Sequence, residues 1–170
     1  IFDGLDKCPD TYQGAEIDQF GCPYDADQDG VVDSLDNCLG TPVGVKVDDK
    51  GCPIAKKIVE KITLSNNVAF ASGSAVIKDE GKPILDGIAE SLRAYPETEI
   101  EISGFADASG PEDFNLKLSE DRVNSVKQYF VAKGITESRM KSIGYGENPE
   151  YFIGDNNTVE GRKLNRRVEI

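Results

Sequence analysis

The chain has 170 residues and a formal net charge of -12 at pH 7, with 31 acidic residues against 19 basic ones. This length suffices for one domain of ordinary size and a smaller module. Nucleic acid would be repelled by the charge and is not expected as a partner. The sequence contains no histidine, which excludes most zinc sites and many acyl-transfer triads.

The first third of the chain differs in composition from the rest. Residues 1–53 contain twelve acidic and three basic residues, together with all four cysteines. Such concentrated acid indicates cation binding rather than a general surface property. An even number of cysteines in a segment with few large apolar residues suggests disulfides and an oxidising compartment such as the periplasm. Because the chain starts abruptly at Ile1, we expect a targeting segment upstream.

An internal repeat of thirty residues organises this segment. Residues 3–8 recur as 33–38, and residues 17–23 recur as 47–53. Units with so few large apolar residues cannot fold on a hydrophobic core alone. Metal ions and cross-links are therefore expected to contribute to their stability.

The four cysteines permit three pairings. The repeat makes Cys8–Cys22 with Cys38–Cys52 the simplest pairing, since each unit is then closed in the same way. Closing a loop of this size stabilises a fold by about 3 kcal/mol through the entropy of the unfolded chain.

Residues 25–36 carry carboxylates at positions 1, 3, 5, 9 and 12, with Gly30 at position 6 for a sharp turn. This spacing matches the ligands of an EF-hand-like calcium loop, with Asp in place of Glu at position 12. Without a hard cation these carboxylates would repel one another, which favours a cation site. The alternative interpretation is a solvated acidic loop without an ion. Magnesium is a weaker candidate, because it prefers to retain water ligands. The predicted Ca²⁺ ligands are Asp25, Asp27, Asp29, Val31, Asp33 and Asp36.

The repeated pattern, with its later Gly-Cys-Pro, resembles the thrombospondin type 3 repeat over residues 1–53. In the first unit, Ile1, Asp3 and Asp6 occupy positions 7, 9 and 12 of the loop. Its beginning is therefore missing from the sequence, and we expect no complete calcium site there. The resemblance implies a small calcium-binding and disulfide-stabilised module.

The remaining residues predict an α+β domain at 61–170 that follows a connector at 54–60. Alternating apolar residues predict strands through 58–64, 98–103, 140–145 and 167–170, and a turn at 66–67 followed by an extended path at 68–70. Apolar residues at helical spacing predict a helix from Pro83 to before Pro96 and another ending at Lys133, followed by Gly134. Residues 147–163 are expected to form a surface loop with room for one helical turn. The order β-α-β-α-β with an added strand predicts helices on one face of a mixed sheet.

Asp107 and Arg122 are the strongest candidates for a site. Asp107 follows a predicted strand in a glycine-containing turn, and Arg122 lies on the apolar stripe of the next helix with Leu118 and Val126. A guanidinium among core-facing positions is costly unless it is paired. One interpretation is a structural Asp107–Arg122 salt bridge. The other is a pocket whose carboxylate binds a ligand ammonium and whose guanidinium binds a ligand carboxylate.

Residues 57–170 resemble the OmpA-like peptidoglycan-binding domain, which has a β-α-β-α-β(β) fold. The residues that carry the resemblance are Phe70, Gly73, Ser74, Leu85, 104–107, Gly110, Asn115, Leu118, Ser119, Arg122, Gly134, Ile135, 144–147 and 165–168. Two departures from the family pattern are Ala106, where the family usually has Thr, and Val123, where Ala is common.

The resemblance implies that Asp107 and Arg122 bind the diaminopimelate of the peptidoglycan stem peptide. It gives Asn115 the role of an assisting amide, and the backbone N–H groups of Ala108 and Gly110 could add neutral donors. Arg166 and Arg167 resemble the family's terminal pair, and either structural bonds or ligand contact would suit them.

The function expected from this resemblance is non-catalytic binding of peptidoglycan, which anchors the outer membrane to the cell wall with a calcium-binding spacer. The expected location is the periplasmic face of the bacterial outer membrane, to which an upstream segment would connect the chain. An enzyme acting on peptidoglycan is not expected, because Glu112, Asp113, Glu120 and Asp121 suit the start and the solvent face of a helix. A calcium-dependent adhesion or protein-interaction module is the alternative.

Overall fold

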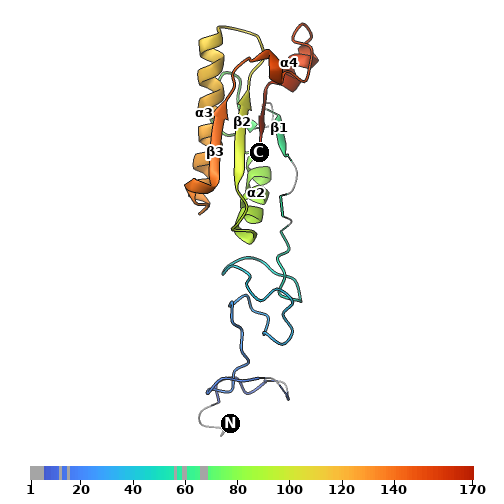
Figure 1. Cartoon of the computed structure of the whole chain (residues 1–170), viewed down its shortest axis with the longest axis vertical. Coiled ribbons are helices and arrows are strands. Elements are labelled where there is room, and N and C mark those ends of the chain that lie inside the picture. The colour runs from blue at the N-terminus through green and yellow to red at the C-terminus, as the bar shows by residue number, and fades with distance from the viewer. Residues whose placement is uncertain (1–5, 12, 15, 56, 59–60, 66–68) are drawn as a thin grey trace. The chain divides into compact units, whose positions relative to one another are not determined.

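The computed structural model describes residues 6–11, 13–14, 16–55, 57–58, 61–65 and 69–170. The chain forms two compact units, Ile1–Lys57 and Ile58–Ile170 (Figure 1). Ile1 and Asp3 of the incomplete first loop lie outside the described residues, as do the turn predicted at 66–67 and the extended path at Val68.

The first unit is held by two disulfides. Cys8 is bonded to Cys22 and Cys38 to Cys52, each across 14 residues of sequence. The pairing that the repeat favoured is therefore confirmed.

Hydrogen bonds in the first unit also recur after thirty residues. In each repeat a threonine hydroxyl donates to the carbonyl of the glycine before the second cysteine, at 2.8 Å and 2.9 Å. In each repeat an isolated antiparallel bridge also joins the proline after that cysteine to the residue six positions before it. The matched pairs are Thr11–Gly21 with Thr41–Gly51, and Ile17–Pro23 with Val47–Pro53. The sequence repeat is thus a structural repeat.

The second unit contains four strands, three α-helices and two 3₁₀ helices in its described residues. In chain order these are β1 (Thr63–Ser65), α2 (Lys82–Ala94), β2 (Ile100–Phe105), α3 (Glu112–Ala132), η1 (Glu137–Arg139), β3 (Met140–Gly144), η2 (Pro149–Tyr151), α4 (Val159–Asn165) and β4 (Arg167–Glu169). The sheet order is β1-β4-β2-β3, in which β2 and β3 are parallel and the other pairs antiparallel. The predicted α+β domain with helices on a mixed sheet is confirmed.

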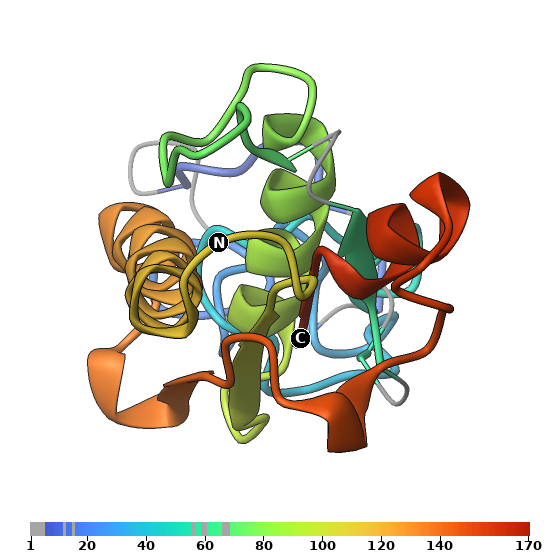
Figure 2. The same cartoon turned by 90° about the horizontal axis from the view of Figure 1, so that it is seen from above.

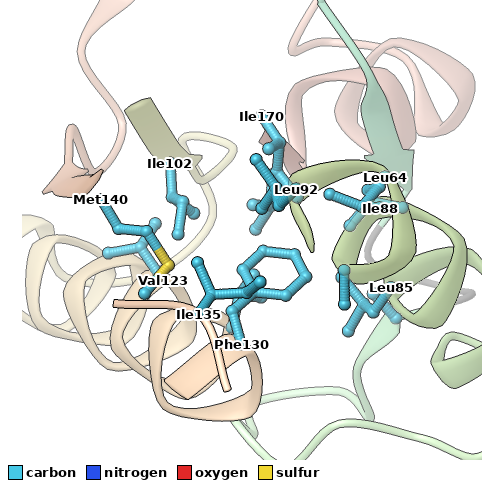
Figure 3. Packing of buried hydrophobic residues seen from close by; sticks show 14 of the residues in the cluster. Leu64, Leu85, Ile88, Leu92, Ile102, Val123, Phe130, Ile135, Met140 and Ile170 are labelled. Carbon is cyan, nitrogen blue, oxygen red and sulfur yellow. The ribbon is translucent and has the colours of Figure 1, made fainter. Parts of the chain in front are cut away.

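Helices α2 and α3 supply the apolar side chains that cover the sheet. Pro83 occupies the first turn of α2, where a missing N–H costs nothing. The buried face of α2 packs with Ile102 of β2 and Phe130 of α3 in one hydrophobic cluster. Figure 3 shows these side chains pointing toward one another, and Figure 2 shows α4 lying apart from α3.

Two glycines bring α3 close to the sheet. A Cβ on Gly104 would lie 2.7 Å from the carbonyl oxygen of Ser119, and one on Gly144 would lie 2.5 Å from the backbone nitrogen of Glu120. Beyond β3, the Gly146 N–H donates to the Ser119 hydroxyl at 2.9 Å. These contacts fix α3 against β2 and β3, and hence the position of Arg122 one turn further on.

Residues 147–163 hold more regular structure than a surface loop with one helical turn. The segment contains η2 and most of α4, whose N-cap Thr158 accepts a hydrogen bond from Gly161 N–H at 2.9 Å. Gly161 is buried against the backbone of Asp155, and Asn165 accepts from the N–H groups of Ile153 and Gly154. Polar and backbone contacts, rather than an apolar face, hold this segment. Its sequence therefore lacks the apolar periodicity that would have predicted a helix.

Candidate ligand-binding pocket and acidic loop

A pocket of about 390 Å³ lies where four separate segments of the second unit meet. The segment after residue 69, the turn after β2, the first half of α3 and the residue before β4 all contribute. The lining residues are Phe70, Ala71, Ser72, Gly73, Ala106, Asp107, Ser109, Phe114, Asn115, Leu118, Arg122 and Arg166. The structure therefore brings Asp107, Asn115 and Arg122 together in one cavity.

The Asp107 carboxylate is buried, with 4% of the residue exposed. Its Oδ1 accepts from the Ser109 N–H at 2.7 Å, and its Oδ2 forms an ion pair with Nη1 of Arg166. The interpretation of a direct salt bridge between Asp107 and Arg122 is wrong, because the ion-pair partner comes from the residue before β4. Each oxygen of a carboxylate has two lone pairs, so Asp107 retains acceptor capacity for a ligand.

Arg122 is also buried, with 4% of the residue exposed. Its Nε donates to the Ser74 carbonyl at 3.0 Å, and its guanidinium carbon lies 5.4 Å from the centroid of the Phe70 ring. Burial and the nearby charge of Arg166 lower the pKa of Arg122 to about 10, against the opposing effect of Asp107. The guanidinium therefore stays charged at neutral pH and is held by a carbonyl and a ring.

Asn115 ties the start of α3 to the turn after β2. Its Nδ2 donates to the carbonyls of Asp107 and Ser109 at 3.2 Å and 3.1 Å. The same nitrogen lies 2.5 Å from Oε2 of Glu147. Its amide hydrogens are thus directed at protein acceptors, and Asn115 positions the backbone of Asp107.

The turn residues Ala108 and Gly110 are not among those that line the pocket. The Ala108 N–H donates to Oδ1 of Asn156 at 3.1 Å, so the neutral donor predicted there is already used within the protein. Gly110 has φ of +103°, a conformation that glycine adopts without strain. In this structure these residues shape the turn around Asp107.

Arg166 and Arg167 have different environments, because successive residues of an extended chain point in opposite directions. Arg167 is buried, donates to Oε1 of Glu169 at 2.7 Å and stacks over the Phe105 ring at 4.0 Å. Arg166 instead lines the pocket and pairs with Asp107. The sequence left structural bonds and ligand contact open for both arginines, and the structure places Arg166 at the pocket and Arg167 away from it.

The acidic loop of the first unit gathers three of its predicted ligands. Carboxylate oxygens of Asp25, Asp27 and Asp29 lie within 4.8 Å of one another, a cluster that does not include Asp33 or Asp36. Oδ1 of Asp33 instead accepts from the Ala26 N–H at 2.7 Å.

Two carboxylate oxygens near this cluster are buried without a hydrogen-bond partner. They are Oδ2 of Asp29 and Oδ2 of Asp36. Both side chains lie against Gly51, because a Cβ there would overlap Oδ1 of Asp36 and lie 3.1 Å from Oδ2 of Asp29. An unpaired buried carboxylate oxygen is costly, and a hard cation is the partner that would remove this cost.

Like charges act on Asp29 in this loop. The hydrogen bond from the Val31 N–H lowers its pKa, but desolvation and the charges of Asp27, Asp36 and Asp25 outweigh that effect, so the pKa of Asp29 is raised. This repulsion is what a bound cation would relieve, and the donor set of oxygens suits Ca²⁺.

The fold and the pocket define an α+β domain with a charged cavity. The chain belongs to the OmpA family, whose model matches residues 69–166. None of the described helices combines the length and the apolar character that crossing a bilayer requires.

The chain is similar to outer membrane porin F of Pseudomonas aeruginosa, with 36% identity over 170 residues, which cover 99% of this chain and 39% of the porin. It is similar to peptidoglycan-binding protein ArfA of Mycobacterium bovis, with 38% identity over 104 residues, 61% of this chain and 31% of the relative. The chain thus spans less than half the length of these relatives. Neither of them is named for a catalysed reaction.

The fold is also similar to the crystal structure of the peptidoglycan-associated lipoprotein from Burkholderia pseudomallei. The TM-score is 0.54 and the identity 25%, over 59% of this chain and 84% of that one. The outer-membrane and lipoprotein relatives place the chain at the periplasmic face of the outer membrane.

Proposed function

We propose that the chain binds peptidoglycan without catalysis, through the diaminopimelate of the stem peptide, and so anchors the outer membrane to the cell wall. The observation that carries this proposal is the pocket in which a buried carboxylate, Asp107, and a buried guanidinium, Arg122, come from different elements. The names of the Mycobacterium and Burkholderia proteins, which refer to peptidoglycan, support it.

The chemistry of diaminopimelate suits these two groups. Its side chain ends in a carbon that carries both an ammonium and a carboxylate. The ammonium donates to the free lone pairs of Asp107, and the carboxylate accepts from the nitrogens of Arg122 that Ser74 does not hold. Each such charge-assisted bond contributes about 1.5–3 kcal/mol. Moderate affinity at one site becomes effective because the polymer presents many copies of the ligand.

The first unit acts as a calcium-binding spacer of the thrombospondin type 3 kind. The carboxylates of the acidic loop and the Val31 carbonyl hold the ion, which neutralises their mutual repulsion when bound. The two unpartnered buried oxygens of Asp29 and Asp36 are the observation that supports this assignment.

A calcium-dependent adhesion or interaction module is the second candidate for the first unit. Among the described residues of this unit, four large apolar residues are more than 60% exposed, and such side chains suit a protein partner. They are Leu35, Leu39, Val43 and Ile54. Capture of a protein by the full chain in calcium, abolished by the Leu39→Ser change and by chelation, would support this candidate.

Isothermal titration of a diaminopimelate-containing stem peptide into the chain tests the main proposal. Asp107→Asn keeps the shape of the side chain and its bond to Ser109 but removes the charge, and we expect its binding heat to vanish. Asp121→Asn, on the exposed side of α3, is the matched control that should bind as the wild type does. Equal binding by both variants would rule out the pocket.

A further inference from the structure

The charges that line the pocket do not balance. Among the described residues that line it, Asp107 is the one carboxylate, whereas Arg122 and Arg166 both carry guanidiniums. Two guanidiniums against one carboxylate give this lining a formal net charge of about +1. Oε2 of Glu147 accepts a hydrogen bond from Nδ2 of Asn115, but Glu147 is not among the lining residues.

A ligand head with one ammonium and one carboxylate would leave this excess in place. Without such a ligand, Asp107 balances the charge of Arg166. When a ligand ammonium donates to Asp107, this carboxylate pairs with two cations, the ammonium and Arg166. The ligand carboxylate then pairs with Arg122. A second ligand carboxylate would balance Arg166.

Arg166 is placed to bind that second carboxylate. Its side chain is 31% exposed, against 5% for Asp107, so it forms the accessible edge of the ion pair. A guanidinium has five N–H donors in a planar fork, which allows it to hold Asp107 and another carboxylate together.

We propose that Arg166 makes the pocket selective for a stem-peptide end with one free ammonium and two free carboxylates. This inference rests on the proposed function and specifies its ligand. The first carboxylate belongs to the diaminopimelate side chain, and the second is the C-terminal carboxylate of the peptide. It comes from diaminopimelate itself when the peptide ends there, or from a following D-alanine. A stem peptide whose ammonium has been consumed in a cross-link lacks the charge that Asp107 recognises.

Titration of matched peptides into the full chain tests the selectivity. The peptides are a tripeptide ending in diaminopimelate and a tetrapeptide ending in D-alanine, each prepared as the free acid and as the C-terminal amide. We expect at least one free acid to bind wild type about tenfold or more tightly than its amide, the value of one charge-assisted bond. The peptide that shows the difference identifies the source of the second carboxylate. Equal affinities of acid and amide in both pairs would overturn the inference.

Arg166→Gln should reduce the ratio of acid to amide affinity toward one while the amide still binds through Asp107 and Arg122. Lys163→Gln removes the same charge from the exposed face of α4 and should keep the wild-type ratio. A wild-type ratio in Arg166→Gln would overturn the role of Arg166. If no peptide binds to wild type at all, the proposed function fails and this inference with it, whereas binding without acid selectivity refutes the inference alone.

Discussion

Arg122 combines a structural cost with the binding role that we propose for it. A buried guanidinium without a full counter-ion is expensive. Here the Ser74 carbonyl and the Phe70 ring compensate for part of that cost without neutralising the charge. The remaining charge is available to an anionic ligand, which explains why a group of this kind is kept at the wall of a pocket.

Gly51 provides a residue-scale test of the acidic loop. Gly51→Ala would force a Cβ into Asp36 and toward Asp29, at a φ of +74° that alanine adopts only under strain. We expect it to lower calcium affinity about tenfold or more, since the two carboxylates would have to separate. Gly44→Ala is the matched control, because its φ is +84° but its Cβ would meet nothing within 4 Å. It should cost only about 1–2 kcal/mol of backbone strain.

Calcium titration by calorimetry would measure the calcium affinity of each variant, and chemical unfolding would measure its free energy of unfolding. Similar calcium affinities in the two glycine variants would show that the position of Asp36 is irrelevant to the ion.

The site could be predicted from sequence only where its residues are close in the chain. Asp107, Asn115 and Arg122 lie within one turn and one helix, so spacing and the family resemblance identified them together. Arg166 forms an ion pair across 59 residues, and Ser74 accepts from Arg122 across 48. Local patterns contain no information on such pairings, because they depend on how β4 and the segment after residue 69 meet the sheet.

At the scale of elements, the approach of α3 to β3 is the contact that positions the pocket. Gly144→Ala would place a Cβ 2.5 Å from the Glu120 nitrogen, and overpacking of this kind costs about 1–3 kcal/mol. Gly87→Ala, within α2 and with nothing within 4 Å of the added Cβ, should instead stabilise the unit by about 0.5–1 kcal/mol. The midpoint temperatures of thermal unfolding should therefore shift in opposite directions in the two variants. A shift in the same direction would contradict this account of the contact between α3 and β3.

Strand β4 contains a carboxylate that makes the fold sensitive to acid. Burial by itself would raise the pKa of Glu169, but the hydrogen bonds and charges of Arg167 and Lys61 outweigh it and lower the pKa. Because the folded pKa lies below the unfolded value, Glu169 stabilises the fold above about pH 4.5. This stabilisation is lost as the pH falls through the folded pKa.

Glu169→Gln should therefore reduce the loss of stability between neutral pH and acid, as measured by urea unfolding at a series of pH values. Glu99→Gln, an exposed position, is the control that should follow the wild-type curve. An unchanged acid dependence in Glu169→Gln would show that other carboxylates dominate this range.

The elements with strong apolar periodicity were predictable, and those held by polar contacts were not. Leu85, Ile88 and Leu92 define α2 by spacing alone, and they are buried as expected. Helix α4 has no such stripe: Leu164 is exposed, and Asn165 is the buried residue that fixes its end to Gly154. A helix held by an amide in this way leaves no periodic signal in its sequence.

At the scale of the whole molecule, the two units depend on different forces. The second unit contains one large hydrophobic cluster. The first has two disulfides, each worth about 3 kcal/mol in the entropy of the unfolded chain, and a proposed ion. Calcium at about 100 times Kd would add about 2.7 kcal/mol to a unit that binds it only when folded.

This difference predicts that the units lose structure under different conditions. Chelation of calcium with reduction of the disulfides should raise hydrogen exchange in peptides from residues 16–55, because neither source of stability then remains. Peptides from residues 100–144 should keep their protection, since the hydrophobic cluster is unaffected by either treatment. Hydrogen–deuterium exchange with mass spectrometry on the full chain measures both regions at once, with added magnesium as the control for ionic strength. Equal loss of protection in both regions would mean that the units unfold as one, whereas no loss in residues 16–55 would argue against calcium and the disulfides as its supports.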